Sequence, residues 1–260
     1  MSRSFIAMQT HRDENIEPLH DRPLRRPNWL DIAHNFTDER DCLAAYLALE
    51  AAEVIGGAKP ANLLNLVDRN RPCGRNIFRL WRRHGSRLLA ESGLAVRELA
   101  QRDDGVLLLL YHPARLAQHL TTPKVANFLR RAGYRQSETI DSALRELADR
   151  CQSGAFPHEI GVLLGYPLKD VAGFLGWVRL PVSGQGPWKI YGDPRPSLDV
   201  VTACRGCREE MARRLADCVA PLECLRIAVD EQRPGVFRPP NENDFQIHKN
   251  AQHVLRMHIS

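Results

Sequence analysis

The feature that most constrains the fold is a strand with no polar face. Residues 106–111 read VLLLLY and follow Asp103-Asp104-Gly105, a turn sequence typical of two antiparallel strands joined in a hairpin. Residues 94–100 supply the first strand of that hairpin. Because both faces of the second strand are apolar, both must be covered, and we expect residues 106–111 to lie at the centre of a sheet.

Helical periodicity surrounds the hairpin. A helix is predicted from the cap Thr37 to Gly56-Gly57, because apolar residues recur on one face and the first turn is acidic. Residues 59–66 allow a short strand. Further helices are expected at residues 75–91, 113–120, 123–132 and 138–151. The pattern predicts an α+β fold, with a small mixed or antiparallel sheet of three to four strands packed with several helices.

Composition sets the limits of this domain. Residues 1–35 are polar, aperiodic and interrupted by proline, which is typical of a disordered arm. Residues 219–260 read as a loop-rich C-terminal tail. We therefore predict a single α+β domain between them, at residues 36–218.

Charge and apolar runs exclude some classes of protein. The formal net charge of +5 permits an anionic partner without requiring one. No run of about 18 apolar residues exists, so the sequence predicts no membrane span. The first residues lack the apolar core of a signal peptide, and the chain has seven cysteines. Together these features predict a cytoplasmic protein whose thiols stay reduced.

Residues 154–193 hold most of the candidate chemistry. Two short helices are expected on either side of Gly165-Tyr166-Pro167, followed by a loop rich in glycine and proline and by a short aromatic strand. Pro157 is expected to open the first helix, which places His158 and Glu159 in its first turn. Ordinary capping is one reading of both residues. The other is that the helix start keeps His158 neutral and able to bind a metal or a substrate group.

The same stretch carries a resemblance to a known family. FPHEIGVLLGYPLKDVAGF and GPWKIYGD resemble segments of an uncharacterised bacterial family, domain of unknown function 3793. The likeness covers roughly residues 42–210, including Lys59-Pro60-Ala61, a strand ending at Tyr111-His112 and Cys207; His112 replaces an arginine of the family pattern. The resemblance implies a fold unit and the place of a site, and no established activity. The family's association with anaerobes implies a setting in iron, haem or redox metabolism.

Polar residues at the ends of predicted elements define a candidate site. Strand ends and helix starts commonly present convergent polar groups. We expect convergence of Lys59, His112, His158, Glu159, Lys189 and Tyr191. The two lysines would bind an anionic group, His158 would coordinate a metal or transfer a proton, and Tyr191 would form a hydrogen bond. The hypothesis is a small anionic ligand or a metal-containing cofactor, with His158 and Lys189 in one site; whether a reaction is catalysed stays open.

Four cysteines near the C-terminus suggest a metal site. If a single helix follows Ser197, Cys204 and Cys218 stand about 21 Å apart at the helical rise per residue, too far to share an ion. Buried thiols are therefore expected. The alternative is a two-ligand metal site or redox pair at Cys204 and Cys207, if Gly206 breaks the helix.

Nucleic-acid binding is the alternative function. Residues 157–178 resemble a helix-turn-helix, and helix 75–91 carries a basic face of arginines. The would-be recognition helix offers only Lys169 and Arg179 to phosphates, whereas a base-reading face is richer in arginine and amide side chains. A pure interaction module is the third possibility, which no motif specifies.

Overall fold

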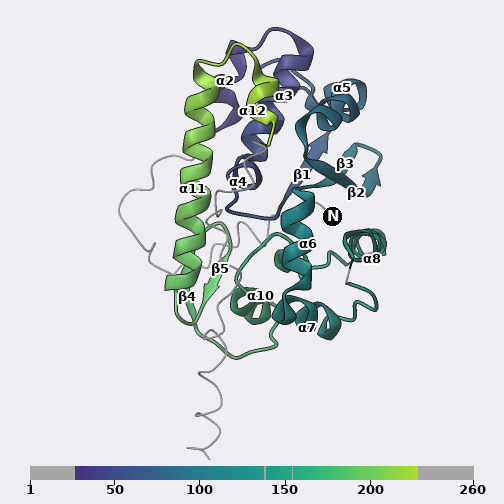
Figure 1. Ribbon diagram of the computed structural model, residues 1–260, viewed down its shortest axis with the longest axis vertical. Helices are drawn as coiled ribbons and strands as arrows, with labels where there is room; N and C mark the ends of the chain where they lie inside the picture. The colour runs from purple at the N-terminus through teal and green to yellow at the C-terminus, as the bar shows by residue number, and fades with distance from the viewer. Residues whose placement is uncertain (1–26, 138, 154, 228–260) are drawn as a thin grey trace, which may run out of the picture.

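A three-stranded antiparallel sheet lies at the centre of the computed structural model, which describes residues 27–137, 139–153 and 155–227 (Figure 1). Its strands are β1 (Ala61–Val67), β2 (Ala95–Arg102) and β3 (Gly105–Tyr111), in the order β1-β3-β2. β3 pairs with both neighbours and is buried from Gly105 to Leu110. The predicted hairpin, the central place of residues 106–111 and the α+β class are confirmed.

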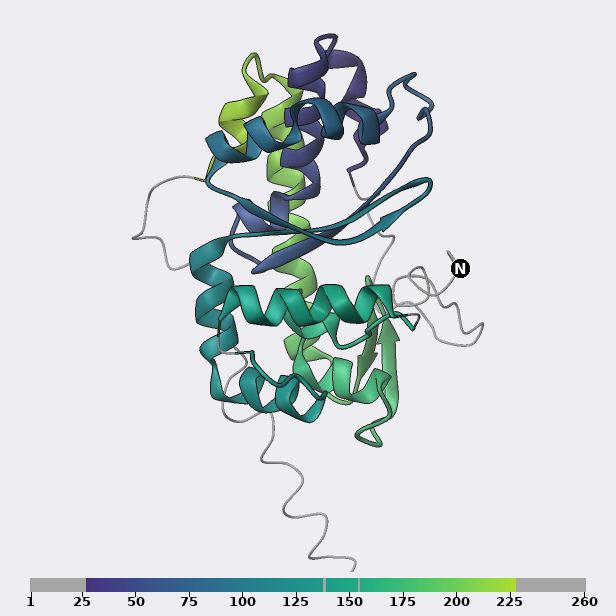
Figure 2. The ribbon, with the colours of Figure 1, turned by 90° about the vertical axis from the view of Figure 1, so that its right-hand side faces the viewer.

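Helices pack on both sides of the central sheet and form two layers (Figure 2). Val106, Leu108 and Leu110 join one apolar cluster, and Leu107 and Leu109 join the other, because successive side chains of a strand point to opposite faces. The α3 layer covers one face with α2 (Trp29–Ile32), η1 (Ala33–Asn35), α3 (Glu39–Glu50), α4 (Ala52–Ile55), α5 (Ile77–Ser92) and α12 (Pro221–Leu225). The α6 layer covers the other with α6 (Pro113–Thr121), α7 (Pro123–Arg131), α8 (Ile140–Gln152), α9 (Ile160–Leu163) and α10 (Leu168–Phe174).

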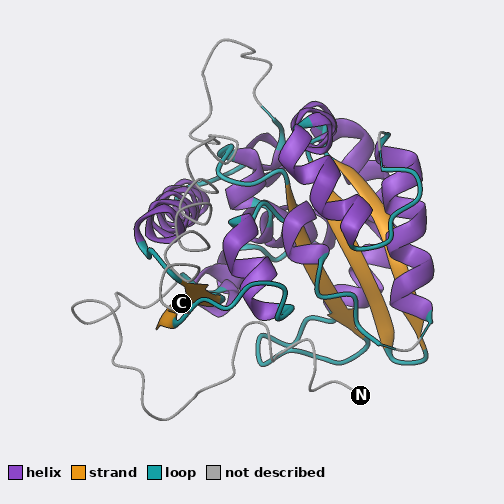
Figure 3. Ribbon diagram, turned by 90° about the horizontal axis from the view of Figure 1, so that it is seen from below, coloured by secondary structure: helices purple, strands orange, loops and turns teal. Residues whose placement is uncertain are grey.

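A second, two-stranded sheet lies apart from the first (Figure 3). β4 (Val182–Gln185) pairs antiparallel with β5 (Lys189–Tyr191). The strand at β5 was predicted, but residues 182–185 were expected to be a loop. Pairing with β5 supplies backbone hydrogen bonds that the local sequence does not reveal, so the loop prediction is wrong there.

One long helix, α11 (Arg195–Ala216), runs beside both layers (Figure 1). It contacts α3, α4 and α12 in the α3 layer, and its Ser197 bonds to α10 in the α6 layer. Gly206 does not break it, as expected, but the helix begins at Arg195 and ends at Ala216, so Ser197 lies inside it rather than before it and Cys218 lies beyond its end. Within the described residues no helix is both long and apolar enough to cross a membrane.

Packed residues extend past both predicted domain limits. The Trp29 side chain is buried and stacks on Phe36 with ring centroids 6.3 Å apart, while Cys224 and Leu225 of α12 belong to the same core. Residues 29–35 therefore pack with the domain rather than with the predicted arm. Most of the arm and of the tail lies outside the described residues, so their order stays a prediction.

Candidate functional site

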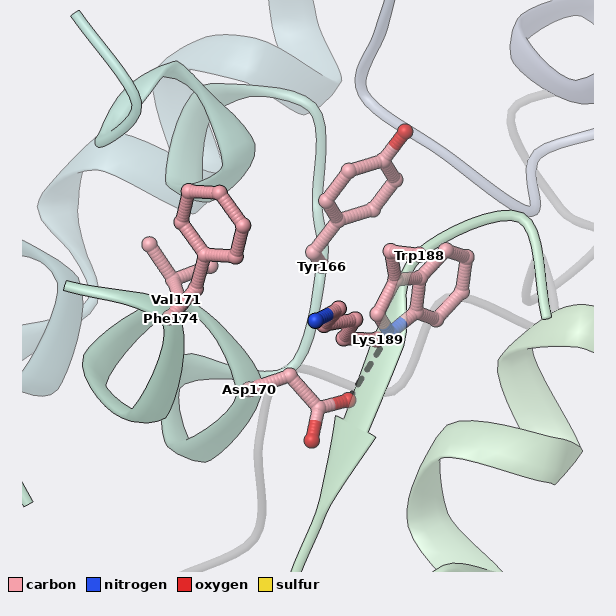
Figure 4. A pocket seen from close by; sticks show the side chains of 6 residues that line it. All are labelled: Tyr166, Asp170, Val171, Phe174, Trp188 and Lys189. Carbon is pink, nitrogen blue, oxygen red and sulfur yellow. Dashed lines mark hydrogen bonds between the residues drawn. The ribbon is translucent and has the colours of Figure 1, made fainter. Parts of the chain in front are cut away.

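A small pocket lies between α10 and β5, and Figure 4 shows the six side chains that line it. We call it the aromatic pocket, and its lining is Tyr166, Asp170, Val171, Phe174, Trp188 and Lys189. Its volume of about 10 Å³ has room for about one water molecule.

Local structure brings these residues together. Gly165 ends α9 in the left-handed conformation, with φ of 79°, and the Tyr166 N–H donates to the Gly161 carbonyl at 2.9 Å. This turn places the Tyr166 ring against the Trp188 indole, stacked with centroids 4.4 Å apart. Asp170 and Phe174 are one turn apart on α10, so both reach the same side of the helix.

The Asp170 carboxylate fixes the wall of the pocket. It is only 2% exposed and accepts four hydrogen bonds. Oδ2 accepts from Trp188 Nε1 at 2.8 Å and from Ser197 Oγ at 2.6 Å; Oδ1 accepts from the Tyr191 N–H at 2.9 Å and from Lys169 Nζ at 2.7 Å. A buried carboxylate needs such partners, and here they join α10, α11 and β5.

Lys169 is a member of this internal network. Its ammonium also donates to the Tyr191 carbonyl at 2.7 Å and to Ser197 Oγ at 2.8 Å, which uses all three of its protons. Lys169 is therefore not presented to a phosphate, as the helix-turn-helix reading requires.

The basic face of α5 is largely ion-paired. Arg79 bonds to Asp68 at 2.9 Å, Arg83 pairs with Glu39, and Arg87 lies 3.5 Å from Glu91. Arg79, Arg83 and Arg87 thus have acidic neighbours, which offset part of the positive charge of this face.

Lys59 lies behind the aromatic pocket. Its side chain is buried, Nζ donates to Asn62 Oδ1 at 2.5 Å, and Nζ is 5.2 Å from the centre of the Tyr166 ring. Asn62 in turn donates to the Glu53 carboxylate at 2.8 Å. Lys59 therefore touches the wall of the pocket through Tyr166, and is not part of its lining.

His158 contacts the pocket through another ring. Its imidazole lies between Phe156 and Phe174, with centroids 5.6 and 4.9 Å away, and Phe174 lines the pocket beside Lys189. Burial lowers the pKa of His158, against a smaller opposing effect of Glu159. Its Nδ1 atom is buried without a hydrogen-bond partner among the described residues. That His158 and Lys189 act on one ligand stays a prediction.

Glu159 is engaged elsewhere. α9 starts at Ile160, so His158 and Glu159 precede the helix instead of lying in its first turn, and Glu159 makes no capping bond. Its carboxylate accepts from Arg150 Nη1 of α8 at 3.0 Å, and Arg150 also lies over the Tyr134 ring at 4.3 Å. The prediction of a first-turn acid is wrong; Glu159 holds α8 against the segment before α9.

His112 and Tyr191 have structural contacts of their own. His112 Nδ1 accepts from the Arg115 N–H at 3.5 Å and caps α6; burial and the Arg115 guanidinium lower the pKa of His112. The Tyr191 ring packs on Gly173, where a Cβ atom would lie 2.5 Å from the ring. Of the predicted site residues, the pocket lining includes Lys189 alone; Lys59 and His158 adjoin that lining.

Cys204 and Cys207 lie in the middle of α11. Cys207 Sγ packs closely against Gly56, because a Cβ atom added to Gly56 would lie 2.5 Å from that sulfur. Burial raises the pKa of the Cys207 thiol. Among the described residues no group of three or more His, Cys, Asp or Glu is placed to hold a metal ion. The two-cysteine site at Cys204 and Cys207 stays a prediction.

The sequence prediction missed the residues that build the pocket. Asp170 and Phe174 share one stripe of α10, and an acid on an apolar stripe is the signal that was available. Trp188 and Tyr166 were seen as parts of a motif and were given no role. Their stacking depends on the turn at Gly165 and on the β4–β5 pairing, which the sequence does not show.

Comparison with known proteins adds one finding. The family described as a protein of unknown function, DUF3793, matches residues 47–225, a range that includes the central sheet and the aromatic pocket. The resemblance seen in the motifs is thereby confirmed. No curated protein and no solved structure matches the chain.

Proposed function

The chain belongs to the DUF3793 family, to which no function is assigned, and from that premise we propose that its domain binds a small anionic ligand at the aromatic pocket. One observation carries the proposal: a single pocket combines the Lys189 side chain with three aromatic side chains, Tyr166, Phe174 and Trp188. An ammonium group binds carboxylates and phosphates, and surrounding rings strengthen that attraction because they exclude water.

A fixed wall supports this role. The Trp188 indole is held by its bond to Asp170 and by stacking on Tyr166. A site whose groups are already ordered loses less conformational entropy when a ligand binds. The Asp170 network thus acts on the ligand indirectly, by keeping the aromatic surface in place.

The local charge favours an anion. Lys169 and Asp170 form an ion pair at 2.7 Å, which offsets the charge of the Asp170 carboxylate at the pocket wall, and Lys189 is a cationic member of the lining. Lys59 lies behind the Tyr166 ring, where Asn62 links it to the Glu53 carboxylate. A cationic side chain in the lining therefore supports binding of an anion.

The size of the pocket narrows the class of ligand. A volume of about 10 Å³ accepts one oxygen atom rather than a whole metabolite. The ligand that fits best is a carboxylate or phosphate whose charged oxygen enters beside Lys189 while its apolar part stays at the mouth. A metal-containing cofactor has less support, since no cluster of three potential metal ligands occurs in the described ranges.

The indole N–H of Trp188 provides a site-specific test. The chain has four tryptophans, and Trp188→Phe assigns the Trp188 signal in a proton–nitrogen NMR spectrum. Titration with benzoate, and separately with inorganic phosphate, is expected to move the Trp188 signal in a saturable way. The signal of Trp29, which is buried in the α3 layer, should stay in place.

Substitutions at Lys189 complete that experiment. Lys189→Met should weaken binding by about tenfold or more, because a charged hydrogen bond is lost, while Lys189→Arg retains part of the affinity. Lys124→Met on α7, outside the pocket lining, is the matched control and should bind normally. Equal shifts in wild type and Lys189→Met would contradict the proposal.

His158 enters the proposal through Phe174. His158→Ala removes a ring that packs on Phe174, so we expect weaker binding of the same probe with a small change in melting temperature. The double variant with Lys189→Met should lose less affinity than the two single losses added together, because both changes act on one pocket. Strict additivity would separate His158 from the site.

A further inference from the structure

Two thiols meet at the junction of α11 and α12. Cys218 lies in the connector that follows α11, and Cys224 lies in α12; both are free thiols. Their Sγ atoms are 3.3 Å apart. A disulfide bond is about 2.0 Å long, so a shift of roughly 1.2 Å would bring the sulfurs into bonding distance.

The connector leaves room for that shift. Residues 217–220 have no regular secondary structure, and Val219 at the middle of the connector is 95% exposed. Cys218 is half-buried, whereas Cys224 is 5% exposed and belongs to the core of the α3 layer. A reagent in solution therefore reaches Cys218 first.

The surroundings of the two thiols assign their order of reaction. Burial, and then the neighbouring Cys218, raise the pKa of Cys224 to about 11, with a smaller opposing effect of Arg214. Cys224 is thus a protonated thiol near neutral pH. Because Cys218 is the more accessible thiol, the first attack on a reagent falls to Cys218 and the closing step to Cys224.

We propose that Cys218 and Cys224 form a reversible disulfide by exchange with a small-molecule disulfide. In the first step the Cys218 thiolate attacks one sulfur of the reagent, a bond to that sulfur forms, and one reagent thiol leaves. In the second step Cys224 loses its proton and attacks Cys218 Sγ, which releases the second reagent thiol. One reagent disulfide is reduced to two thiols while two protein thiols are oxidised.

The bond would fasten α12 to the end of α11. α12 has five residues, too few to be stable alone, and it packs against α3 and α5. Just after it, the Ile227 N–H donates to the Ser92 carbonyl at 2.9 Å and Arg226 Nε donates to the Glu91 carbonyl at 3.2 Å. Closing a short loop in the unfolded chain is expected to raise the melting temperature by roughly 5 °C.

The sequence around the pair allows a direct test on the full-length protein. Trypsin cuts after Arg214 and Arg226, which leaves both thiols in the single peptide LADCVAPLECLR. The protein is equilibrated in buffers with increasing ratios of oxidised to reduced glutathione, alkylated and digested. We expect this peptide to become lighter by two hydrogen atoms and to escape alkylation, and to revert when reduced glutathione is restored.

Amide exchange and the melting temperature provide two further tests of the Cys218–Cys224 disulfide. Oxidation should slow the amide exchange of Ile227, and Cys218→Ala should abolish both that slowing and the rise in melting temperature. Cys204→Ala, which removes a thiol in the middle of α11, is the matched control and should leave both effects intact. A peptide that gains glutathione on Cys218 without losing the Cys224 thiol, or one that stays fully reduced, would overturn the proposal.

Discussion

The α3 and α6 layers each contain a buried ionic network, and the two networks differ in what they border. In the α3 layer Arg208 donates to the Pro27 carbonyl at 2.9 Å, to the Leu49 carbonyl at 3.0 Å and to Glu50 at 2.7 Å, all within protein. In the α6 layer Asp170 is equally satisfied, but it also lines a pocket. Burial of a charge is therefore not a functional signal by itself; what distinguishes Asp170 is that it also lines a pocket.

The largest expected effect is a loss of stability when Arg208 is removed from the buried network of the α3 layer. Arg208→Met leaves Glu50 and two carbonyl groups without their partner, and we expect a loss of about 3–5 kcal/mol in the free energy of unfolding. Denaturant titration measures it. Arg213→Met, at an exposed position on the same helix, should cost less than about 1 kcal/mol. A small loss at Arg208 would show that this network does not stabilise the α3 layer.

An intermediate effect is expected at Asp170. Asp170→Asn removes the counter-charge of Lys169 and one acceptor, which should lower the free energy of unfolding by about 2–3 kcal/mol. Because the indole of Trp188 loses its charged partner, its NMR signal should shift as well. Asp199→Asn, at an exposed position on α11, is the control. An unshifted Trp188 signal in Asp170→Asn would show that the Asp170 carboxylate does not hold the Trp188 indole in the pocket wall.

The smallest expected effect is a difference between the two layers in how their stability depends on pH. Burial lowers the pKa of His112, His119 and His158, all in the α6 layer or at its edge. Their folded pKa values lie below the unfolded value of 6.5, so acid favours the unfolded chain, and stability falls as the pH drops below about 6.5.

Amide exchange measured at pH 7 and pH 5 separates the two layers. After correction for the intrinsic rates, α6 should lose protection worth about 1 kcal/mol per histidine or less, while α3 keeps its protection. His119→Gln should reduce the loss, since His119 is the most buried of the three and its Nε2 bonds to the Val162 carbonyl at 2.7 Å. Equal losses in both layers would remove this distinction.

Prediction from sequence succeeded for elements whose structure is determined by residues close together in the chain. The VLLLLY strand, the turn at residues 103–105 and the end of α9 at Gly165 follow from side-chain periodicity and backbone preference. The cap of α3 shows the limit of this reasoning. Thr37 was expected, but Asp38 accepts the N–H bonds of Arg40 and Asp41, because either residue type can cap a helix.

The candidate site was predicted only in part, because its partners are distant in the chain. Trp188 and Ser197 lie 18 and 27 residues from Asp170, and the sequence does not show which polar groups will meet. Glu159 illustrates the converse: its position suggested a ligand-binding acid, yet Arg150 on α8 pairs with it. Lys189 was identified correctly as a residue at a strand end, but its aromatic neighbours were not.

The position of α11 has a consequence for how the chain folds as it is synthesised. Arg208 bonds to Pro27, 181 residues earlier, and to Leu49, 159 residues earlier, while Ser197 completes the Asp170 network. Neither network can therefore be complete until α11 has left the ribosome. The nascent chain therefore carries two incomplete polar networks through most of translation, and contacts of such long sequence separation form slowly. We expect the last steps of folding to wait for the synthesis of α11.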